Sequence, residues 1–352
     1  MTHQVRYVKV AYPPSVGQNS IAEHGDQLVR AIREFSGAMA DTTDLDVLRS
    51  DVSGPDTTVL LQYNPFAYGR WGFAPQLVAR IHRLTRRRVR PRIVLVLHEP
   101  YVPFVPDRSM ATAAWQRLQL LALTRSCDAT IAVTAAWKRR AERLVRGTRP
   151  VHNVPVGSNV PDKRAERQHA RDTLGVDERT VVVAQFGTNH PSRLNDHTRV
   201  TVEQLERSGV PAVLLNLGHQ ARPVAADCAT REVLPGYLQL EGLAALLSAA
   251  DVFLSPCIDG VSTRRTSIMA ALQHGVPVVG TFTPDTDDSL REGPAVRLAP
   301  VHDVQRFAQL AVALASSRDE LDRSAIAARA LFEREFAWSV IAARFLHVLR
   351  SE

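Results

Sequence analysis

One short segment of the sequence gathers most of the residue types that bind phosphate. It lies between an apolar run at residues 251–256 and an amphipathic run that ends at Gly275. Glycine lets the backbone approach a ligand closely, hydroxyl and N–H groups bind phosphate oxygens, and arginine pairs with phosphate through two N–H groups. The segment therefore predicts a diphosphate site, and the alternative is a solvated capping loop. Its members are Asp259, Gly260, Val261, Ser262, Thr263, Arg264, Arg265, Thr266 and Ser267.

Two further turns of this kind occur in the second half of the chain. Gly187, Thr188 and Arg193 follow the apolar run at 180–186, and Gly218 follows the run at 212–217. In open α/β sheets, ligands collect beyond the carboxyl ends of the strands, and anions favour helix N-termini, where backbone N–H groups are unpaired. We therefore expect these residues beside the same diphosphate, while Gly218 also suits an ordinary turn between a strand and a helix.

In the first half of the chain, polar and aromatic residues follow two apolar runs. Tyr63 and Asn64 end the run at 58–64, and His98 follows the run at 92–97, with Glu99 and Tyr101 close behind. A single histidine after a strand is more often structural than catalytic, but these neighbours favour a functional role. The pattern predicts a catalytic His98 and a wall for a sugar or another acceptor.

Several common catalytic motifs are missing from the sequence. It contains no H-E-x-x-H, no repeated Asp-x-Asp, no G-x-S-x-G, no Walker A and no G-x-G-x-x-G motif. The cysteines Cys127, Cys228 and Cys257 are widely spaced, which favours small buried side chains over a metal or redox site. These absences argue against a metal site, a covalent hydrolase, a kinase and a dehydrogenase of the usual kinds.

The elements that must position these residues alternate between strands and helices. Apolar runs rich in β-branched residues alternate with amphipathic stretches, which is typical of βα units on parallel sheets and predicts an α/β fold. The expected strands are 6–12, 58–64, 92–99, 129–134, 180–187, 212–218, 231–236, 251–256 and 277–281. The expected helices are 20–35, 73–84, 110–126, 135–145, 195–209, 240–250, 262–275, 304–317 and 324–351.

The length of 352 residues favours two domains over a single core. A cluster of Pro, Gly, Ser and Asn at 155–161 is the expected linker. We therefore predict an N-terminal Rossmann-like domain at 1–158 and a C-terminal one at 159–330. The segment from about 331 to 352 is expected to pack back on the first domain.

The net charge of +7 favours anionic partners without choosing among them. The densest basic patch is Arg80, Arg83, Arg86, Arg87, Arg88, Arg90 and Arg92. A solvated helix end is the first interpretation, weak contact with an anionic membrane the second, and nucleic acid the last, because no aromatic residues interleave the arginines. No apolar run approaches the ~20 residues of a spanning helix, and the N-terminus does not resemble a signal peptide, so we expect a cytoplasmic protein.

Taken in order, these segments resemble the GT-B glycosyltransferases of family 4. SIAEHGDQLVRAIREF is similar to that family's first helix, LHEPY to its histidine-bearing turn, CDATIAVTAAWKRRAERL to a strand and helix, and VPVGSNVP to its crossing between domains. The strongest part is VLPGYLQLEGLAALLSAADVFLSPCIDGVSTRRTSIMAALQHGVPVVGT, which resembles the donor-binding stretch.

The resemblance implies two Rossmann-like domains facing across a cleft and sugar transfer from a nucleotide diphosphate sugar, with retention and without metal or cofactor. UDP, GDP and dTDP are all open as the nucleotide, and the acceptor is a small molecule or a glycan. By resemblance, Gly187, Thr188 and Arg193 approach the diphosphate, Gly236 and Leu238 the base, residues 259–267 the sugar and phosphates, and His98 the reacting sugar.

The sequence departs from the family pattern at two places. The usual pair of glutamates is replaced by Ser262 and Ala270, so Asp259 is expected to take the catalytic place of the first. The usual Gly-Gly of the first loop is replaced by Gly17, Gln18 and Asn19, which we place at the acceptor side or cleft. These departures leave open a catalytically silent protein that binds glycans or nucleotide sugars, and, within the same fold, an epimerase or phosphorylase.

Overall fold

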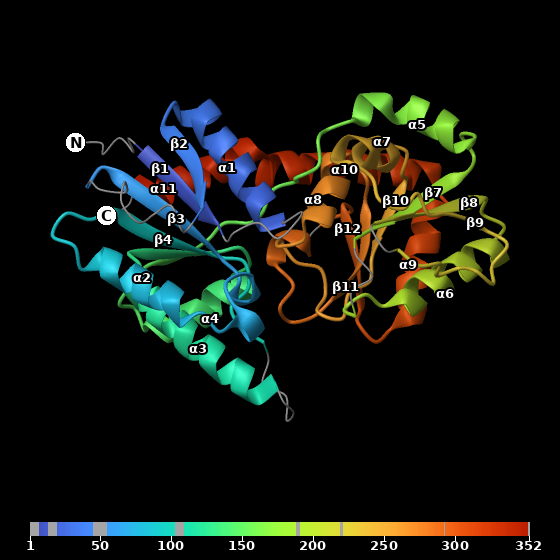
Figure 1. Cartoon of the computed structure of the whole chain (residues 1–352). Coiled ribbons are helices and arrows are strands. Elements are labelled where there is room, and N and C mark those ends of the chain that lie inside the picture. The colour runs from blue at the N-terminus through green and yellow to red at the C-terminus, as the bar shows by residue number, and fades with distance from the viewer. Residues whose placement is uncertain are drawn as a thin grey trace. The chain divides into compact units, whose positions relative to one another are not determined.

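The computed structural model describes residues 7–12, 20–44, 55–102, 109–187, 191–218, 221–291 and 293–350 (Figure 1). The chain divides into two compact units. Unit 1 comprises Met1–Val156 and Trp338–Glu352, and unit 2 comprises Gly157–Ala337. The division after Val156 lies two residues before the predicted one, and residues 331–337 remain with unit 2 rather than returning to unit 1.

Unit 1 is built on a parallel sheet with the strand order β2-β1-β3-β4-β5-β6 among its described residues. The strands are β1 (Tyr7–Tyr12), β2 (Met39–Asp44), β3 (Thr57–Tyr63), β4 (Arg92–Leu97), β5 (Ala129–Ala132) and β6 (Val151–Asn153). β4 is central in this order, and its residues Ile93 to Leu97 are fully buried because helices cover both faces of the sheet.

The helices of unit 1 lie on the two faces of its sheet (Figure 1). They are α1 (Ser20–Ser36), α2 (Pro75–Thr85), α3 (Ser109–Ser126), α4 (Ala135–Val145) and α11 (Trp338–Arg350), with short 3₁₀ turns η2 (Pro65–Ala67) and η3 (Arg70–Gly72). α1 packs on α11, while α3 packs on both α2 and α4. The amphipathic α11 buries Ile341 and Phe345, so this late segment of the chain belongs to the core of unit 1.

Unit 2 has a second parallel sheet, with the order β12-β11-β10-β7-β8-β9 among its described residues. The strands are β7 (Val181–Phe186), β8 (Ala212–Leu217), β9 (Arg231–Val233), β10 (Val252–Ser255), β11 (Val278–Phe282) and β12 (Val296–Pro300). The helices are α5 (Arg167–Leu174), α6 (Asn195–Arg207), α7 (Leu240–Ser248), α8 (Thr266–Gln273), α9 (Val304–Ala315) and α10 (Arg318–Glu335), with η4 (Arg164–Glu166) and η5 (Asp288–Leu290). The predicted α/β class is confirmed in both units.

A buried ion-pair network fixes the centre of the second sheet. The carboxylate of Asp251, just before β10, accepts hydrogen bonds from Arg167 (2.5 Å), from Arg171 (3.0 Å) and from the backbone N–H of Val182 on β7 (2.8 Å). Since a buried charge is tolerated only when it is paired and hydrogen-bonded, this network anchors the start of β10 beside β7. β7 and β10 are the two strands whose following loops carry the candidate site.

Each sheet has one point at which the chain reverses its direction of winding. In unit 2 the chain passes from β7 to β8 and β9 on one side, and then returns to β10, β11 and β12 on the other. In unit 1 the corresponding point lies between β1 and β3. Ligands of open α/β sheets bind outside the carboxyl ends of the strands at such points.

Candidate functional site

The loops that follow β7 and β10 are joined at the switch point of unit 2. Arg193 and Cys257 form an antiparallel bridge, the N–H of Leu194 donates to the carbonyl of Pro256 (2.9 Å), and the N–H of Ile258 donates to the carbonyl of Ser192 (2.8 Å). This pairing brings Arg193 against the segment at 259–267, as the sequence predicted for two turns of one sheet edge.

Gly187 and Gly218 end the neighbouring strands β7 and β8 in backbone contact. A Cβ atom on Gly218 would lie 2.1 Å from the carbonyl oxygen of Gly187, and one on Gly187 would lie 2.8 Å from Nη2 of Arg193. Both residues have φ values that L side chains rarely adopt, 139° for Gly187 and 147° for Gly218. The missing side chain at Gly187 makes room for the Arg193 guanidinium at the end of β7, and the missing side chain at Gly218 makes room for the backbone of Gly187.

Arg193 is a half-buried cation. Burial lowers the pKa of its guanidinium from the ordinary value, and the neighbouring Arg265 lowers it further, while Cys257 opposes the shift. Within the described ranges, no carboxylate pairs with Arg193. A partly desolvated cation beside another cation is stabilised by an anion, so this position favours an anionic ligand.

Asp259 holds the two following arginines in place. Its two carboxylate oxygens accept hydrogen bonds from Arg264 and Arg265, one oxygen each. Burial alone would raise the pKa of Asp259, but Arg265 and Arg264 outweigh it and lower that pKa below its usual range. We expected Arg264 and Arg265 at the donor diphosphate, with at least one of them within reach of a phosphate oxygen, and this stays a prediction. In the structure both arginines pair with Asp259, and the Nε–H of Arg265 is buried without a hydrogen-bond partner.

The rest of the 259–267 segment is fixed by neighbouring loops. The N–H and hydroxyl of Thr263 donate to the buried carboxylate of Asp287 (2.9 and 3.0 Å). A Cβ atom on Gly260 would lie 2.9 Å from Oγ1 of Thr286. Val261, which we predicted at the donor, is fully buried and packs against Gly280, so its side chain belongs to the core.

The N-terminus of α8 opens from this segment. Arg265 occupies the cap position, and no side chain caps the first turn, which begins with Thr266 and Ser267. The buried hydroxyl of Ser262 has no hydrogen-bond partner. Unpaired N–H groups at a helix N-terminus attract anions, and here they lie next to two arginine side chains.

Of the residues predicted to bind the donor, Gly236 and Leu238 lie apart from this cluster, and Thr188 is not among the described residues. Gly236 and Leu238 follow β9, which is separated from β7 by β8, and Gly236 is exposed with a φ of 74°. The prediction that Gly236 and Leu238 contact the base therefore stays a prediction.

In unit 1, His98 is held by a residue of the neighbouring strand. Its Nε2 lies 2.5 Å from Oε1 of Gln62 on β3, and its ring meets the ring of His24 edge to face, with 4.9 Å between centroids. Because an amide oxygen only accepts, Nε2 of His98 carries the proton and Nδ1 keeps a lone pair. The ring of Trp338 lies on His24, at 5.4 Å between centroids.

Both histidines of this pair are neutral at ordinary pH. Burial lowers the pKa of His24 from 6.5 to about 4, against a weaker opposing effect of Gln62. Burial, followed by the neighbouring His24, lowers the pKa of His98 well below 6.5. His24 is buried and neither ring nitrogen makes a hydrogen bond, nor does Nε2 of Gln62.

Sequence reasoning did not single out His24, Gln62 or Trp338. The signal for His24 is its position on the buried stripe of α1 with Ile21 and Leu28, where a polar residue is unexpected. Gln62 is likewise a buried polar residue, and it directly follows the apolar run Val59 to Leu61 of β3. Buried polar residues of this kind mark places that a tertiary structure must satisfy or use.

The acceptor-side predictions have mixed outcomes. Tyr63 is fully buried and accepts a hydrogen bond from Gln119 (2.9 Å), and burial raises its pKa to about 12, so it is a core residue and not a wall of the site. Asn64 donates a hydrogen bond to Glu99 (3.2 Å). The guanidinium of Arg117 lies over the ring of Tyr101, with its Cζ 3.9 Å from the ring centroid. Gly17, Gln18 and Asn19 lie outside the described residues.

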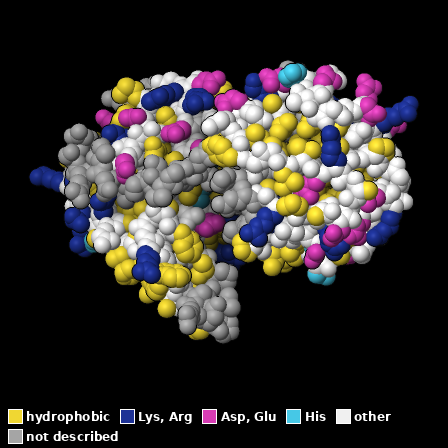
Figure 2. Space-filling model, turned by 45° about the vertical axis from the view of Figure 1, so that its right-hand side comes forward, with side chains coloured by type: hydrophobic (Ala, Val, Ile, Leu, Met, Phe, Trp, Pro, Cys, Tyr) yellow, Lys and Arg dark blue, Asp and Glu magenta, His cyan; other side chains and the backbone are white. Residues whose placement is uncertain are grey.

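The basic patch at 80–92 is only partly available to a partner. Arg90 forms a bidentate pair with the carboxylate of Asp128, with two hydrogen bonds of 2.8 Å. Arg92 donates to the carbonyls of Val348 and Leu349 near the C-terminal end of α11. On the face shown in Figure 2, Lys and Arg side chains are scattered among Asp and Glu. No helix in the described ranges is long and apolar enough to cross a membrane, and no cluster of three metal-ligating side chains occurs among the same residues.

The chain shares its fold and part of its sequence with known glycosyltransferases. Residues 218–317 match the family model of glycosyl transferases group 1, whereas no curated protein sequence matches the chain. Among solved structures, sucrose-phosphate synthase from Thermosynechococcus elongatus is 14% identical, with a TM-score of 0.73 over 98% of both chains.

Two further structures have the same architecture. HepE of Anabaena, solved in complex with UDP and glucose, is 12% identical, with a TM-score of 0.69 over 99% of this chain and 100% of its own. WaaG, a glycosyltransferase involved in lipopolysaccharide biosynthesis, is 12% identical, with a TM-score of 0.65 over 96% of this chain and 99% of its own. The chain therefore has the GT-B fold of these glycosyltransferases, and its residues 218–317 match a glycosyl transferases group 1 domain.

Proposed function

We propose that the protein transfers a sugar from a nucleotide diphosphate sugar to a small-molecule or glycan acceptor, with retention and without a bound metal, as in family 4. One observation carries the proposal. Arg193, a half-buried cation that pairs with no carboxylate in the described part of the chain, lies at the switch point of unit 2 beside Arg265. A diphosphate supplies the negative charge that this position lacks.

The proposed chemistry is electrostatic assistance to a leaving group. Negative charge develops on the diphosphate as the bond to the sugar breaks, and preorganised donors in a partly desolvated site stabilise that charge. Arg193, Arg265 and the uncapped start of α8 are the donors that this chain offers. Asp259 keeps the two arginines oriented, which is a positioning role.

His98 is proposed to contact the reacting sugar. Nε2–H is held by Gln62, so Nδ1 is the atom that can accept a hydrogen bond from the sugar. The depressed pKa of His98 keeps that lone pair available across the physiological range. The ring would then interact with the sugar as positive charge develops on it.

The nucleotide is proposed to be UDP, GDP or dTDP. UDP is the first candidate to test, because HepE was solved with UDP and a second relative is a UDP-forming trehalose-phosphate synthase. The decisive experiment incubates the protein with a panel of nucleotide sugars and measures release of the free nucleotide. Release from one donor supports transfer, whereas a thermal shift by a donor without any release favours the silent binding protein.

Metal independence is tested in the same assay. Turnover is expected to persist in excess chelator, because the proposed stabilisation of the diphosphate comes from arginine and backbone N–H groups. Complete loss of turnover that magnesium or manganese restores would contradict this part of the proposal.

Weak contact with anionic membranes is a further proposal about partners. Arg83, Arg86 and Arg88 are exposed at the C-terminal end of α2 and just beyond it. Co-sedimentation with vesicles of phosphatidylglycerol should fall steeply as salt is raised, and equal sedimentation with neutral vesicles would exclude an electrostatic contact.

A further inference from the structure

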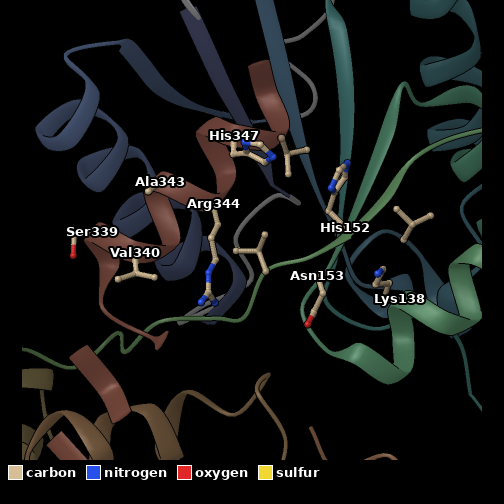
Figure 3. Close-up of a pocket in the computed structure, with 11 residues that line it drawn as sticks. Lys138, His152, Asn153, Ser339, Val340, Ala343, Arg344 and His347 are labelled. Carbon is tan, nitrogen blue, oxygen red and sulfur yellow. The ribbon is translucent and has the colours of Figure 1, made fainter. Parts of the chain in front are cut away.

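A cavity lies in unit 1, between α4, β6 and α11 (Figure 3). Its volume is about 750 Å³, within the range of cavities that hold organic ligands. Its lining residues are Lys138, Val151, His152, Asn153, Val154, Ser339, Val340, Ala343, Arg344, His347 and Val348. All of them belong to unit 1, and none is among the residues proposed to bind the donor.

Nitrogen-bearing side chains from three elements line this cavity. Lys138 comes from α4, His152 from β6, and Arg344 and His347 from α11 (Figure 3). No aspartate or glutamate is among its lining residues. Lys138 has a carboxylate 3.5 Å away on Glu142 of its own helix, but both side chains are well exposed, and such pairs are weak.

Three basic side chains act on His152. Burial lowers the pKa of His152, and His347, Lys138 and Arg92 lower it further. Arg92 is fixed there, since its guanidinium donates to the carbonyls of Leu349 (2.8 Å) and Val348 (3.2 Å). The lining thus supplies basic side chains and no carboxylate.

Apart from the polar Asn153 and Ser339, the remaining lining residues are apolar. Val151 and Val154 come from the β6 segment, and Val340, Ala343 and Val348 from α11. A bare inorganic anion would leave these walls in contact with water. A ligand that combines an anionic group with an apolar or flat face matches the cavity more completely.

We propose that this cavity binds a small organic phosphate monoester. Arg344 and Lys138 supply two permanent charges, which match a dianion better than a carboxylate, and the two histidines add N–H donors. The lining of the cavity also includes residues from both segments that connect unit 1 to unit 2 along the chain. Val154 lies two residues before the end of the first segment at Val156, and Ser339 follows the start of the second at Trp338.

The binding test uses phenyl phosphate as the probe and the full chain with isotope-labelled histidine. Ring signals of His152 and His347, assigned by their loss in His152→Gln and His347→Gln, should shift together on titration. Arg344→Gln and Lys138→Gln should each weaken binding at least about tenfold, the loss expected for a charge-assisted hydrogen bond. Unmoved ring signals at millimolar phenyl phosphate would overturn the proposal.

Arg350→Gln is the matched control, because it removes the same charge from the same helix and lines no part of the cavity. The affinity of Arg350→Gln for phenyl phosphate should equal that of the wild type. A loss as large as in Arg344→Gln would show that only the net charge matters, and it would overturn the proposed site. Melting temperatures of all variants establish that they are folded. Arg193→Gln should leave both ring shifts intact, which separates this site from the proposed donor site.

A lipid headgroup and a soluble metabolite both carry phosphate monoesters. Vesicles that contain phosphatidic acid distinguish them. Co-sedimentation that Arg344→Gln abolishes and Arg350→Gln preserves would identify the lipid source. Phenyl phosphate binding without such co-sedimentation would identify a soluble ligand.

Discussion

The Arg193 guanidinium occupies the space that a side chain at position 187 would need. A Cβ atom on Gly187 would lie 2.8 Å from Nη2 of Arg193. Glycine is therefore needed at position 187 for two reasons: for the backbone conformation of the turn, and to leave space for the Arg193 guanidinium. A larger residue at position 187 would thus move the Arg193 guanidinium while leaving its charge in the protein.

Gly187→Ala should weaken nucleotide diphosphate binding by about tenfold, the size of one lost charge-assisted hydrogen bond. Isothermal titration with the cognate nucleotide measures it. Gly209→Ala is the control, because Gly209 also has a positive φ but a Cβ there would meet nothing within 4 Å. Equal losses in both variants would show that backbone strain, and not displacement of Arg193, causes the effect.

Arg193→Gln should reduce nucleotide diphosphate affinity by about one to two decades. The glutamine keeps part of the side chain's volume and removes its charge. Arg306→Gln on the exposed face of α9 serves as the control and should bind normally. Unchanged affinity in Arg193→Gln would remove the main support for the donor site.

Asp259 should stabilise the fold in a pH-dependent way. Because its pKa in the folded protein is lowered, its contribution is present above the unfolded pKa and is lost as the pH falls through the folded value. In urea unfolding between pH 6 and pH 3, Asp259→Asn should therefore lose less stability on acidification than the wild type. Parallel curves for the two proteins would contradict the ion pairs with Arg264 and Arg265.

His98→Ala should lower kcat by at least about tenfold, which is 1.4 kcal/mol of transition-state stabilisation. Nucleotide affinity should change much less, because the proposed interaction forms mainly in the transition state. Steady-state kinetics and titration with the nucleotide separate the two effects. A lowered melting temperature with normal kcat of the folded fraction would make His98 a structural residue.

His24 should make the fold sensitive to mild acid. Its pKa falls from 6.5 to about 4 on folding, so its contribution is present above pH 6.5 and is lost as the pH drops toward 4. From pH 7 to pH 5 the wild type should lose roughly 2 kcal/mol that His24→Gln retains. His82→Gln, at an exposed position of α2, should behave as the wild type, and an identical loss in His24→Gln would contradict the buried neutral ring.

Most of the fold could be predicted because long apolar runs and amphipathic stretches alternate along the chain. β2, β6 and β12 were missed, since β2 (MADTTD) is largely polar and β6 has only three residues. The stretch at 324–351 was read as one helix, but it is the end of α10 and the whole of α11, divided near Phe336. Local periodicity does not reveal such a break when both helices are amphipathic.

The candidate site could be predicted only at the level of its turns. The glycines and arginines after β7 and β10 mark the sheet edge, because parallel strands bring their carboxyl ends together. The hydrogen bonds from Arg264 and Arg265 to Asp259 depend on side-chain conformations, which the spacing of these residues in the sequence does not determine. The burial of Tyr63 and the contact of His24 with His98 depend on helix packing from distant parts of the chain.

The return of α11 to unit 1 sets an order for folding during synthesis. The 181 residues from Gly157 to Ala337 are translated between the two parts of unit 1. At 5–20 residues per second, this takes about 10 to 40 seconds. During that time α1 is already made but lacks α11, the helix that packs on it in the folded unit. A nascent chain of this protein therefore leaves the face of α1 that packs on α11 uncovered until α11 itself is made.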